Sequence, residues 1–382
     1  MRVLFLIRSL ERGGAERQLI GLVRGLNDVG VEVSVCTFYD GGALRGELES
    51  IPGVSVYSLG KKGRWDVRSL PHRLFRVIRT FRPDVIHGYM AFANELALLA
   101  GRLGRIGVVW GLRSSKVDPS LYDDFSWRQF AVGARLSRFA DAIIVNSEAG
   151  RKHHSCFGYS DKQMVVVPNG IDCERFRPDR SLGLSVRERW GVQPDERLIG
   201  IVARINPVKD HRTFLGAAAN LSRREKRVRF VCVGGGAPAD VNDLKNFAKE
   251  LDLERHLIWA DARDDMHAVY NALDVLALSS ISEGFPNVVA EAMATSKPCA
   301  VTDVGDAAKI VGDCGVTVPP REPEALAEGL LALLNLPPAA RAEIGARARD
   351  RVVRGFSIPA LVRTTQGILE RAARREQAKL SI

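Results

Sequence analysis

The sequence predicts an α/β protein built from two doubly wound domains. Short runs rich in Val and Ile alternate with helical stretches over both halves of the chain, and such runs are typical of parallel strands buried on both faces. The length of 382 residues is too great for one compact domain and suits two. We expect one domain over residues 1–180 and a second over residues 181–356.

Each strand is expected where a short apolar run precedes a helical stretch. The first series ends at the turn cluster Pro168–Asp172, and a polar stretch to about Pro194 leads into the second. Doubly wound sheets bind ligands at the carboxyl ends of their strands, so two facing domains predict a site in the cleft between them. The expected strands are Val3–Ile7, Val31–Phe38, Val54–Ser58, Val85–His87, Val108–Trp110, Ala142–Asn146, Met164–Val167, Leu198–Ala203, Val228–Val233, Leu257–Ala260, Val275–Ser279, Pro298–Thr302 and Gly315–Val318.

The composition is that of a soluble globular protein with a basic surplus. Hydrophobic residues make up 46% and charged residues 26%, which excludes a disordered or fibrous chain. The net charge of +10 leaves nucleic acid, an anionic membrane and negatively charged small substrates as partners to weigh. Residues 1–170 contain 24 Lys and Arg residues against 16 Asp and Glu residues, so most of the surplus lies in the first half.

Cysteine usage and the N-terminus predict a cytoplasmic protein, or one attached to a membrane from the cytoplasmic side. The six cysteines are scattered without a CxxC pair, which favours reduced thiols over a disulfide framework. The run Met1–Leu10 contains Arg8 and lacks a small-residue cleavage site, so it reads as a strand rather than a signal peptide. No uncharged run reaches the about 20 residues that span a bilayer.

The most informative segment is Ser282–Ala294, SEGFPNVVAEAMA, directly after an expected strand. Pro286 suits the first position of a helix. The backbone N–H groups between Phe285 and Val288, of which Pro286 has none, would then point out of the helix N-terminus and could hold a phosphate or a sugar hydroxyl. Glu283 lies just before this helix and Glu291 in its second turn, so the two carboxylates are expected to hold different parts of an extended ligand.

With this motif the sequence resembles the family 4 retaining glycosyltransferases, which have the GT-B architecture of two Rossmann-like domains and an interdomain cleft. The spacing of Glu283 and Glu291 is similar to the hallmark of that family, and the resemblance covers nearly the whole chain. The resemblance also implies that a last helix, residues 357–382, packs back on the first, acceptor-side domain. Further matching positions are Gly13–Glu16, Arg204, Lys209, Tyr270–Val275 and Thr302–Gly305.

The resemblance implies a nucleotide-diphosphate-sugar donor, a UDP- or GDP-sugar, bound by the second domain. Arg204 can fork onto phosphate oxygens and Lys209 can supply a point charge. Glu291 would bind the ribose hydroxyls and Glu283 the donor sugar. Gly13, Gly14 and Gly234 equally suit plain turns. In addition to Arg204, Lys209, Glu283 and Glu291, the candidates for donor binding are Gly13, Gly14, Gly234, Arg263, Gly284, Phe285, Pro286 and Asn287.

The acceptor side is less typical of the family. Arg113 stands near a position at which many relatives carry a histidine, and a guanidinium cannot act as a general base. This is compatible with same-face displacement, in which the departing phosphate takes the acceptor proton and Arg113 stabilises charge or holds an anionic acceptor group. His87, at the end of an expected strand, is a second candidate for catalysis, with a structural role as the alternative.

The sequence contains no DxD motif in a suitable loop and no His/Cys cluster with metal spacing. The resemblance therefore implies a metal-independent enzyme without a cofactor. Arg204, Lys209 and helix dipoles would stabilise the charge that a divalent cation stabilises elsewhere.

A basic segment, residues 61–82, contains eight Lys and Arg residues and a single acid, Asp66. Leu74, Ile78 and Phe81 share one helical face, and such a helix can lie on anionic lipid at the cytoplasmic face of the inner membrane. The alternative is that its apolar face packs on its own domain. No nucleic-acid-binding signature is present. The residues expected to face the membrane are Lys61, Lys62, Arg64, Arg68, Arg76 and Arg79.

These observations predict a retaining glycosyltransferase that moves a sugar from a nucleotide-diphosphate donor to a hydroxyl of a glycan or lipid-linked acceptor, in cell-surface polysaccharide or glycolipid synthesis. One alternative is a GT-B nucleotide-sugar epimerase or a phosphorylase. A second alternative is a scaffold without activity that binds membrane or nucleic acid. An epimerase would release free nucleotide without an acceptor, and a scaffold would not bind nucleotide diphosphates.

Overall fold

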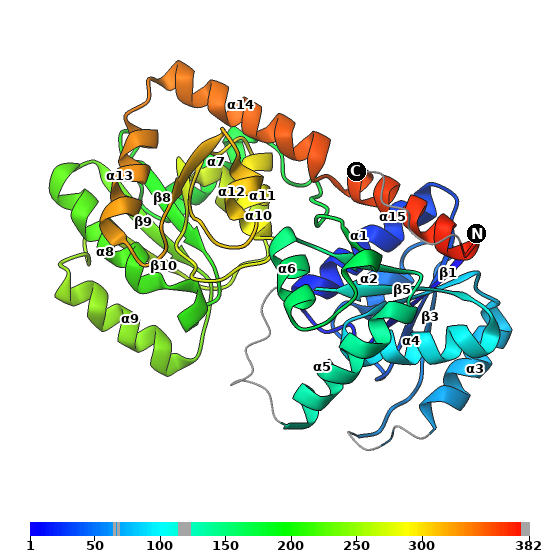
Figure 1. Cartoon of the computed structure of the whole chain (residues 1–382). Helices are drawn as coiled ribbons and strands as arrows, with labels where there is room; N and C mark the ends of the chain where they lie inside the picture. The colour runs from blue at the N-terminus through cyan, green and yellow to red at the C-terminus, as the bar shows by residue number, and fades with distance from the viewer. Residues whose placement is uncertain (64–65, 67–68, 114–123, 376–382) are drawn as a thin grey trace. The chain divides into compact units, whose positions relative to one another are not determined.

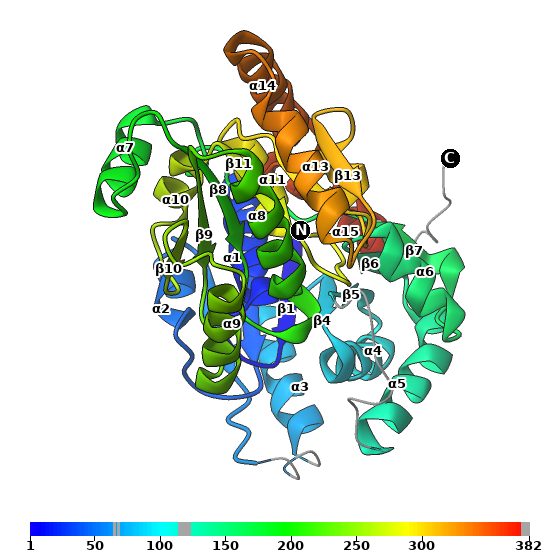
Figure 2. The same ribbon diagram turned by 90° about the vertical axis from the view of Figure 1, so that its left-hand side faces the viewer.

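The structure, a computed structural model, describes residues 1–63, 66, 69–113 and 124–375. The chain divides into two compact units, one formed by Met1–Gly170 and the chain from Ile358 onward, the other by Ile171–Ser357. Each unit contains one parallel sheet with helices on both faces (Figures 1 and 2). All thirteen expected strands are present, and their ends differ from the expected ones by at most two residues. The two doubly wound folds are therefore confirmed.

The first unit has a seven-stranded sheet in the order β3-β2-β1-β4-β5-β6-β7. One apolar cluster packs α3, α4 and α5 on one face, and a second packs α1, α2 and α15 on the other. The elements are β1 (Arg2–Ile7), α1 (Gly14–Asp28), β2 (Glu32–Thr37), α2 (Arg45–Glu49), β3 (Ser55–Ser58), α3 (Leu70–Phe81), β4 (Val85–Tyr89), α4 (Ala91–Gly104), β5 (Gly107–Leu112), α5 (Asp124–Leu136), η2 (Ser137–Phe139), β6 (Ala142–Val145), α6 (Glu148–Cys156), η3 (Asp161–Gln163), β7 (Met164–Val166) and α15 (Ile358–Ala373).

The second unit has a six-stranded sheet in the order β10-β9-β8-β11-β12-β13. Helices α8, α9 and α13 pack on one face, and α7, α10, α11, α12 and α14 on the other. The elements are α7 (Arg180–Arg189), β8 (Arg197–Val202), η4 (Pro207–Lys209), α8 (His211–Arg224), β9 (Val228–Val233), α9 (Pro238–Glu250), β10 (Leu257–Ala260), α10 (Met266–Ala272), β11 (Val275–Leu278), α11 (Asn287–Ala294), β12 (Cys299–Thr302), α12 (Ala307–Val311), β13 (Gly315–Val318), α13 (Pro323–Leu334) and α14 (Pro338–Gly355).

The polar stretch after the turn cluster belongs to the second unit, which begins at Ile171 rather than near residue 181. Helix α7 anchors this stretch to α10. The Asp179 N–H donates to Oδ1 of Asn271 at 2.8 Å, and the Arg187 guanidinium bonds the Ala272 carbonyl at 3.0 Å. These contacts fix the stretch on the second unit.

Helix α15 carries the end of the chain back to the first unit, where Leu361, Val362 and Leu369 enter the apolar cluster under β1 and α1. It begins at Ile358 and ends at Ala373, short of the expected residue 382. Arg375 adopts a left-handed φ of 54°, which ends the helical path. Residues 376–382 lie outside the described part of the chain.

The contact between α15 and β5 requires a glycine at position 107. A Cβ at Gly107 would lie 2.4 Å from the carbonyl oxygen of Ala372, which is backbone and cannot rotate away. We expect Gly107→Ala to lower the free energy of unfolding by about 1–3 kcal/mol through overpacking, measured by urea unfolding. Gly46→Ala in α2 is the matched control, because a Cβ there meets nothing within 4 Å. Equal stability of the two variants would contradict this packing.

Candidate active site

The carboxyl edge of the second sheet brings Lys209 and Glu283 together. Nζ of Lys209 lies 2.5 Å from Oε1 of Glu283, and Oγ of Ser280 donates to the same oxygen at 2.6 Å. The Lys209 and Glu283 side chains are 23% and 10% exposed, respectively. Lys209 follows β8 and Glu283 follows β11, and these strands are neighbours because the strand order reverses at β8. In doubly wound sheets this reversal is where ligands bind.

Backbone contacts tie the two loops to each other. Oγ of Ser279 donates to the Lys209 carbonyl at 3.0 Å, and the Ile281 N–H donates to the Val208 carbonyl at 2.9 Å. The Lys209 N–H donates to the side chain of Asn206 at 3.2 Å, which closes the η4 turn. The ammonium group of Lys209 is thus held in place by its own loop and by the loop that carries Glu283.

A third loop, after β12, packs directly on Glu283 and Gly284. Gly305 has a φ of 59°, and a Cβ there would lie 2.4 Å from the Glu283 carbonyl oxygen. The Asp306 N–H donates to the Gly284 carbonyl at 2.8 Å. Gly305 is therefore needed both for its left-handed backbone and for this close approach.

The helix after Glu283 starts one residue later than expected. Pro286 occupies the N-cap position with φ −72° and ψ 94°, so α11 begins at Asn287. Phe285 and Pro286 are buried and Asn287 is half-buried. The Phe285 ring packs against Phe356 at a centroid distance of 5.5 Å, which points it into its own unit rather than toward a ligand.

Glu291 in α11 is held by a buried tyrosine. The Tyr270 hydroxyl donates to Oε2 of Glu291 at 2.7 Å, and Tyr270 is fully buried. Burial, together with the adjacent Glu291 carboxylate, holds the pKa of Tyr270 well above its usual range. Tyr270 therefore stays protonated and fixes the direction of the carboxylate.

The remaining donor-binding candidates of the second unit differ in their exposure to solvent and in the groups that they contact. Arg204 lies in the loop between β8 and η4 with an exposed side chain. Arg263 is held by Asp265, with Nε 2.7 Å and Nη2 2.5 Å from the two carboxylate oxygens. Gly234 has a φ of 144°, and a Cβ there would lie 2.0 Å from the Ala203 carbonyl oxygen, so the packing of two strand ends accounts for this glycine.

At the start of α1, Gly13 is the N-cap and Gly14 the first helical residue. The Glu16 carboxylate lies against this end of the helix, because a Cβ at Gly13 would be 2.1 Å from its Oε2. A Cβ at Gly14 would meet nothing within 4 Å. A carboxylate at a helix N-terminus is favourable. An anion that approaches this end would compete with Glu16.

In the first unit Arg113 directly follows β5, whereas His87 is the central residue of β4, which continues to Tyr89 instead of ending at His87 as expected. Arg113 bonds Oδ1 of Asn169 at 3.1 Å and also the hydroxyl of Tyr89. His87 is fully buried, with its ring centroid 5.0 Å from those of Phe5 and Tyr89. Burial, helped by the charge of Arg113, lowers the pKa of His87 well below its usual range. The imidazole is therefore neutral and is shielded by its neighbours.

The basic segment places its apolar face against its own domain. Leu74, Ile78 and Phe81 of α3 are buried in the first unit's core, whereas Arg76 and Arg79 are exposed. Lys62 is also exposed, and Lys61 lies against Tyr39, with Nζ 5.3 Å from the ring centroid. Arg64 and Arg68 lie outside the described residues. Among the helices of the described part of the chain, none is long and apolar enough to cross a membrane.

Sequence reasoning did not assign roles to Ser280, Tyr270 and Gly305. Ser280 lies two residues after β11 and three before Glu283, and this closeness in the sequence is a signal that could have been used. Tyr270 was noted only for its spacing, because a tyrosine in a short amphipathic helix reads as core.

Sequence models of two families match the chain. The model described as Glycosyltransferase Family 4 matches residues 12–175, and the model described as Glycosyl transferases group 1 matches residues 196–336. A Bacillus subtilis protein named as the glycosyltransferase EpsF is 27% identical over 315 residues, which cover 79% of each chain. A D-inositol 3-phosphate glycosyltransferase from Catenulispora acidiphila is 28% identical, over 86% of this chain and 83% of its own.

Solved glycosyltransferase structures share the fold. HepE from Anabaena, solved in complex with UDP, superposes with a TM-score of 0.84 at 24% identity, over 97% of this chain and 100% of its own. A sucrose-phosphate synthase from Thermosynechococcus elongatus superposes with a TM-score of 0.79 at 19% identity, over 97% of this chain and 99% of its own. With its two parallel sheets and its matches to both family models, the chain belongs to the group 1, family 4 glycosyltransferases of GT-B fold.

Proposed function

We propose that this glycosyltransferase moves a sugar, with retention of configuration, from a nucleotide-diphosphate donor to a hydroxyl of a glycan or lipid-linked acceptor. The product would belong to a cell-surface polysaccharide or glycolipid. The observation that carries the proposal is the Lys209–Glu283 contact at the sheet edge, with Arg204 on the same loop as Lys209. HepE has also been solved with UDP-glucose, which supports a UDP-sugar donor.

In the proposed reaction the acceptor oxygen attacks the anomeric carbon on the face that the leaving group departs from. The bond between that carbon and the diphosphate oxygen breaks, and the diphosphate leaves with the electron pair. The acceptor proton passes to the departing phosphate. Arg204 and Lys209 stabilise the negative charge that grows on the diphosphate, as a metal ion does in other enzymes. Glu283 accepts hydrogen bonds from the donor sugar and Glu291 from the ribose.

The first unit supplies the acceptor side in this proposal. Arg113 cannot take a proton, and its contacts with Tyr89 and Asn169 hold its guanidinium in one place. An anionic group on the acceptor would suit this cation. Several relatives are named for transfer to D-inositol 3-phosphate, which carries such a group.

The donor site predicts a loss of turnover when either cation is removed. We expect Arg204→Ala and Lys209→Ala each to lower nucleotide-sugar turnover by about 10²–10³-fold, because each removes a group that binds the leaving diphosphate. Nucleotide diphosphate release is measured over UDP-, GDP- and ADP-sugars, after a thermal-shift screen identifies the nucleotide.

A matched control separates this effect from folding. Lys209→Ala leaves the mostly buried Glu283 without its cation and can destabilise the fold, whereas Arg204 is exposed and its removal should leave the melting temperature unchanged. Lys226→Ala, at another exposed cation of the same unit, should keep full activity. Wild-type turnover in Arg204→Ala and Lys209→Ala would refute the site.

The Tyr270–Glu291 contact predicts a separate effect on donor binding. Glu291→Ala should raise the KM for the donor about tenfold, and Tyr270→Phe by a smaller factor of about three to ten, because one hydrogen bond to the carboxylate is lost. The kcat should change little in Tyr270→Phe. An unchanged KM in both variants, measured by initial rates at varied donor concentration, would argue against Glu291 as a donor ligand.

We further propose that the protein meets the cytoplasmic face of an anionic membrane through the exposed cations of residues 61–82. Because the apolar face of α3 is buried, this contact is electrostatic. Arg76, Arg79 and Arg82 are exposed on or next to the same helix.

Vesicle sedimentation tests the membrane proposal. The double variant Arg76→Glu, Arg79→Glu should weaken binding to phosphatidylglycerol-containing vesicles at least about tenfold, since each cation near the surface contributes about 1 kcal/mol. The matched double variant Arg223→Glu, Lys226→Glu, at exposed cations of the second unit, should bind as wild type does. Equal losses in the two double variants, or no wild-type binding, would reject the proposal.

A further inference from the structure

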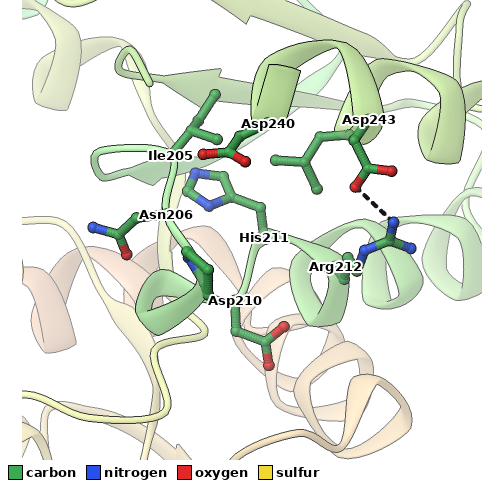
Figure 3. A pocket seen from close by; sticks show the side chains of 9 residues that line it. Ile205, Asn206, Asp210, His211, Arg212, Asp240 and Asp243 are labelled. Carbon is green, nitrogen blue, oxygen red and sulfur yellow. Dashed lines mark hydrogen bonds and ion pairs between the residues drawn. The ribbon is translucent and has the colours of Figure 1, made fainter. Parts of the chain in front are cut away.

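A pocket opens between the η4 turn, the start of α8 and helix α9, and neither Lys209 nor Glu283 is among the residues that line it. Its volume is about 230 Å³, larger than the about 150 Å³ cavity that is known to accept benzene in an engineered protein. Ile205, Pro207 and Leu244 give it apolar walls, and the remaining lining residues are polar or charged (Figure 3). The pocket can therefore hold a small organic molecule with an apolar body and a polar group.

His211, the first residue of α8, lines this pocket and has unmet hydrogen-bonding capacity. The residue is 3% exposed, and neither ring nitrogen has a hydrogen-bond partner among the described residues. Burial lowers the pKa of His211 to about 4, so the ring is neutral near pH 7 and offers one donor and one acceptor. Buried polar groups in folded proteins are normally satisfied, so a partner for this ring is expected.

The charged residues of the pocket favour a cation. Three aspartates and one arginine line it, and Arg212 is already paired with Asp243 at 2.7 Å. The Asp210 carboxylate caps α8 through Thr213 and points away from the His211 ring in Figure 3. Asp240 is exposed and lines the pocket from the first turn of α9. An anion such as phosphate would be repelled here.

We infer that this pocket binds a small organic ammonium compound. Its N–H groups donate to a ring nitrogen of His211 and to the carboxylate of Asp240, and its apolar body lies against Pro207 and Leu244. Figure 3 shows the His211 ring directed to the side of the pocket lined by Ile205 and Asp240. The ring nitrogens are shielded from solvent, so the proposal requires the side chains that line the pocket to move when the ligand binds. The described residues contain no group of three side chains suited to a metal ion, which favours an organic cation.

Three small molecules that share a cyclohexane ring but differ in charge test the inference on the full chain. Cyclohexylamine is cationic near pH 7, cyclohexanol is neutral and cyclohexanecarboxylate is anionic. With histidine labelled by ¹⁵N, we expect cyclohexylamine to shift the His211 ring signals in a saturable way. Cyclohexanol should bind about tenfold or more weakly, since the charge contribution is lost, and the carboxylate should leave the signals unchanged.

Two variants and one control locate the site. Asp240→Asn should weaken cyclohexylamine binding about tenfold, and His211→Phe should abolish it. Glu250→Gln, at the exposed end of the same helix α9, should bind as wild type does. If His211→Phe fails to fold, Asp240→Asn still decides, because Asp240 is exposed. Equal binding by Asp240→Asn and Glu250→Gln, equal binding of all three probes, or no shift of His211 would overturn the inference.

Discussion

The contact between Lys209 and Glu283 joins the loops that follow the two central strands of the second unit's sheet. These residues are far apart in the sequence, yet the ammonium and carboxylate groups meet because β8 and β11 are neighbours in the sheet. Both side chains are mostly buried, so each needs the other's charge while no ligand is bound. In the proposed function, a donor diphosphate supplies new negative charge to Lys209, and the second oxygen of Glu283 is then available to the sugar.

The loops around this contact are positioned by backbone packing rather than by side chains alone. Gly305 brings the loop after β12 onto Glu283, and Gly234 lets the loop after β9 approach the end of β8. The carboxyl ends of parallel strands meet at one edge, so short loops converge there without long excursions. The hydroxyl of Tyr270, in α10, donates a hydrogen bond to Glu291 of α11 and so positions that carboxylate at the same edge.

The strands and the two-unit division were predictable because parallel strands buried on both faces read as continuous apolar runs. The Glu283–Glu291 motif likewise predicted a loop followed by a helix, and the helix is present from Asn287, one residue later than expected. The Lys209–Glu283 contact was not predictable, because each residue was assigned to a ligand and a strand-end contact over 74 residues leaves no local pattern. His87 was expected at a strand end, but β4 continues to Tyr89 and the ring is buried beside Phe5 and Tyr89, which agrees with the structural alternative. Local backbone geometry set the remaining differences, at Pro286 and Arg375.

Calorimetric titration of the wild type and of Lys209→Ala with UDP and with uridine tests the central claim most directly, that Lys209 serves the donor diphosphate. Uridine lacks the diphosphate, so it measures the contribution of the base and ribose alone. We predict that Lys209→Ala weakens UDP binding about tenfold or more and leaves uridine binding unchanged. Equal losses for UDP and uridine, or unchanged UDP affinity in a folded Lys209→Ala protein, would contradict the account.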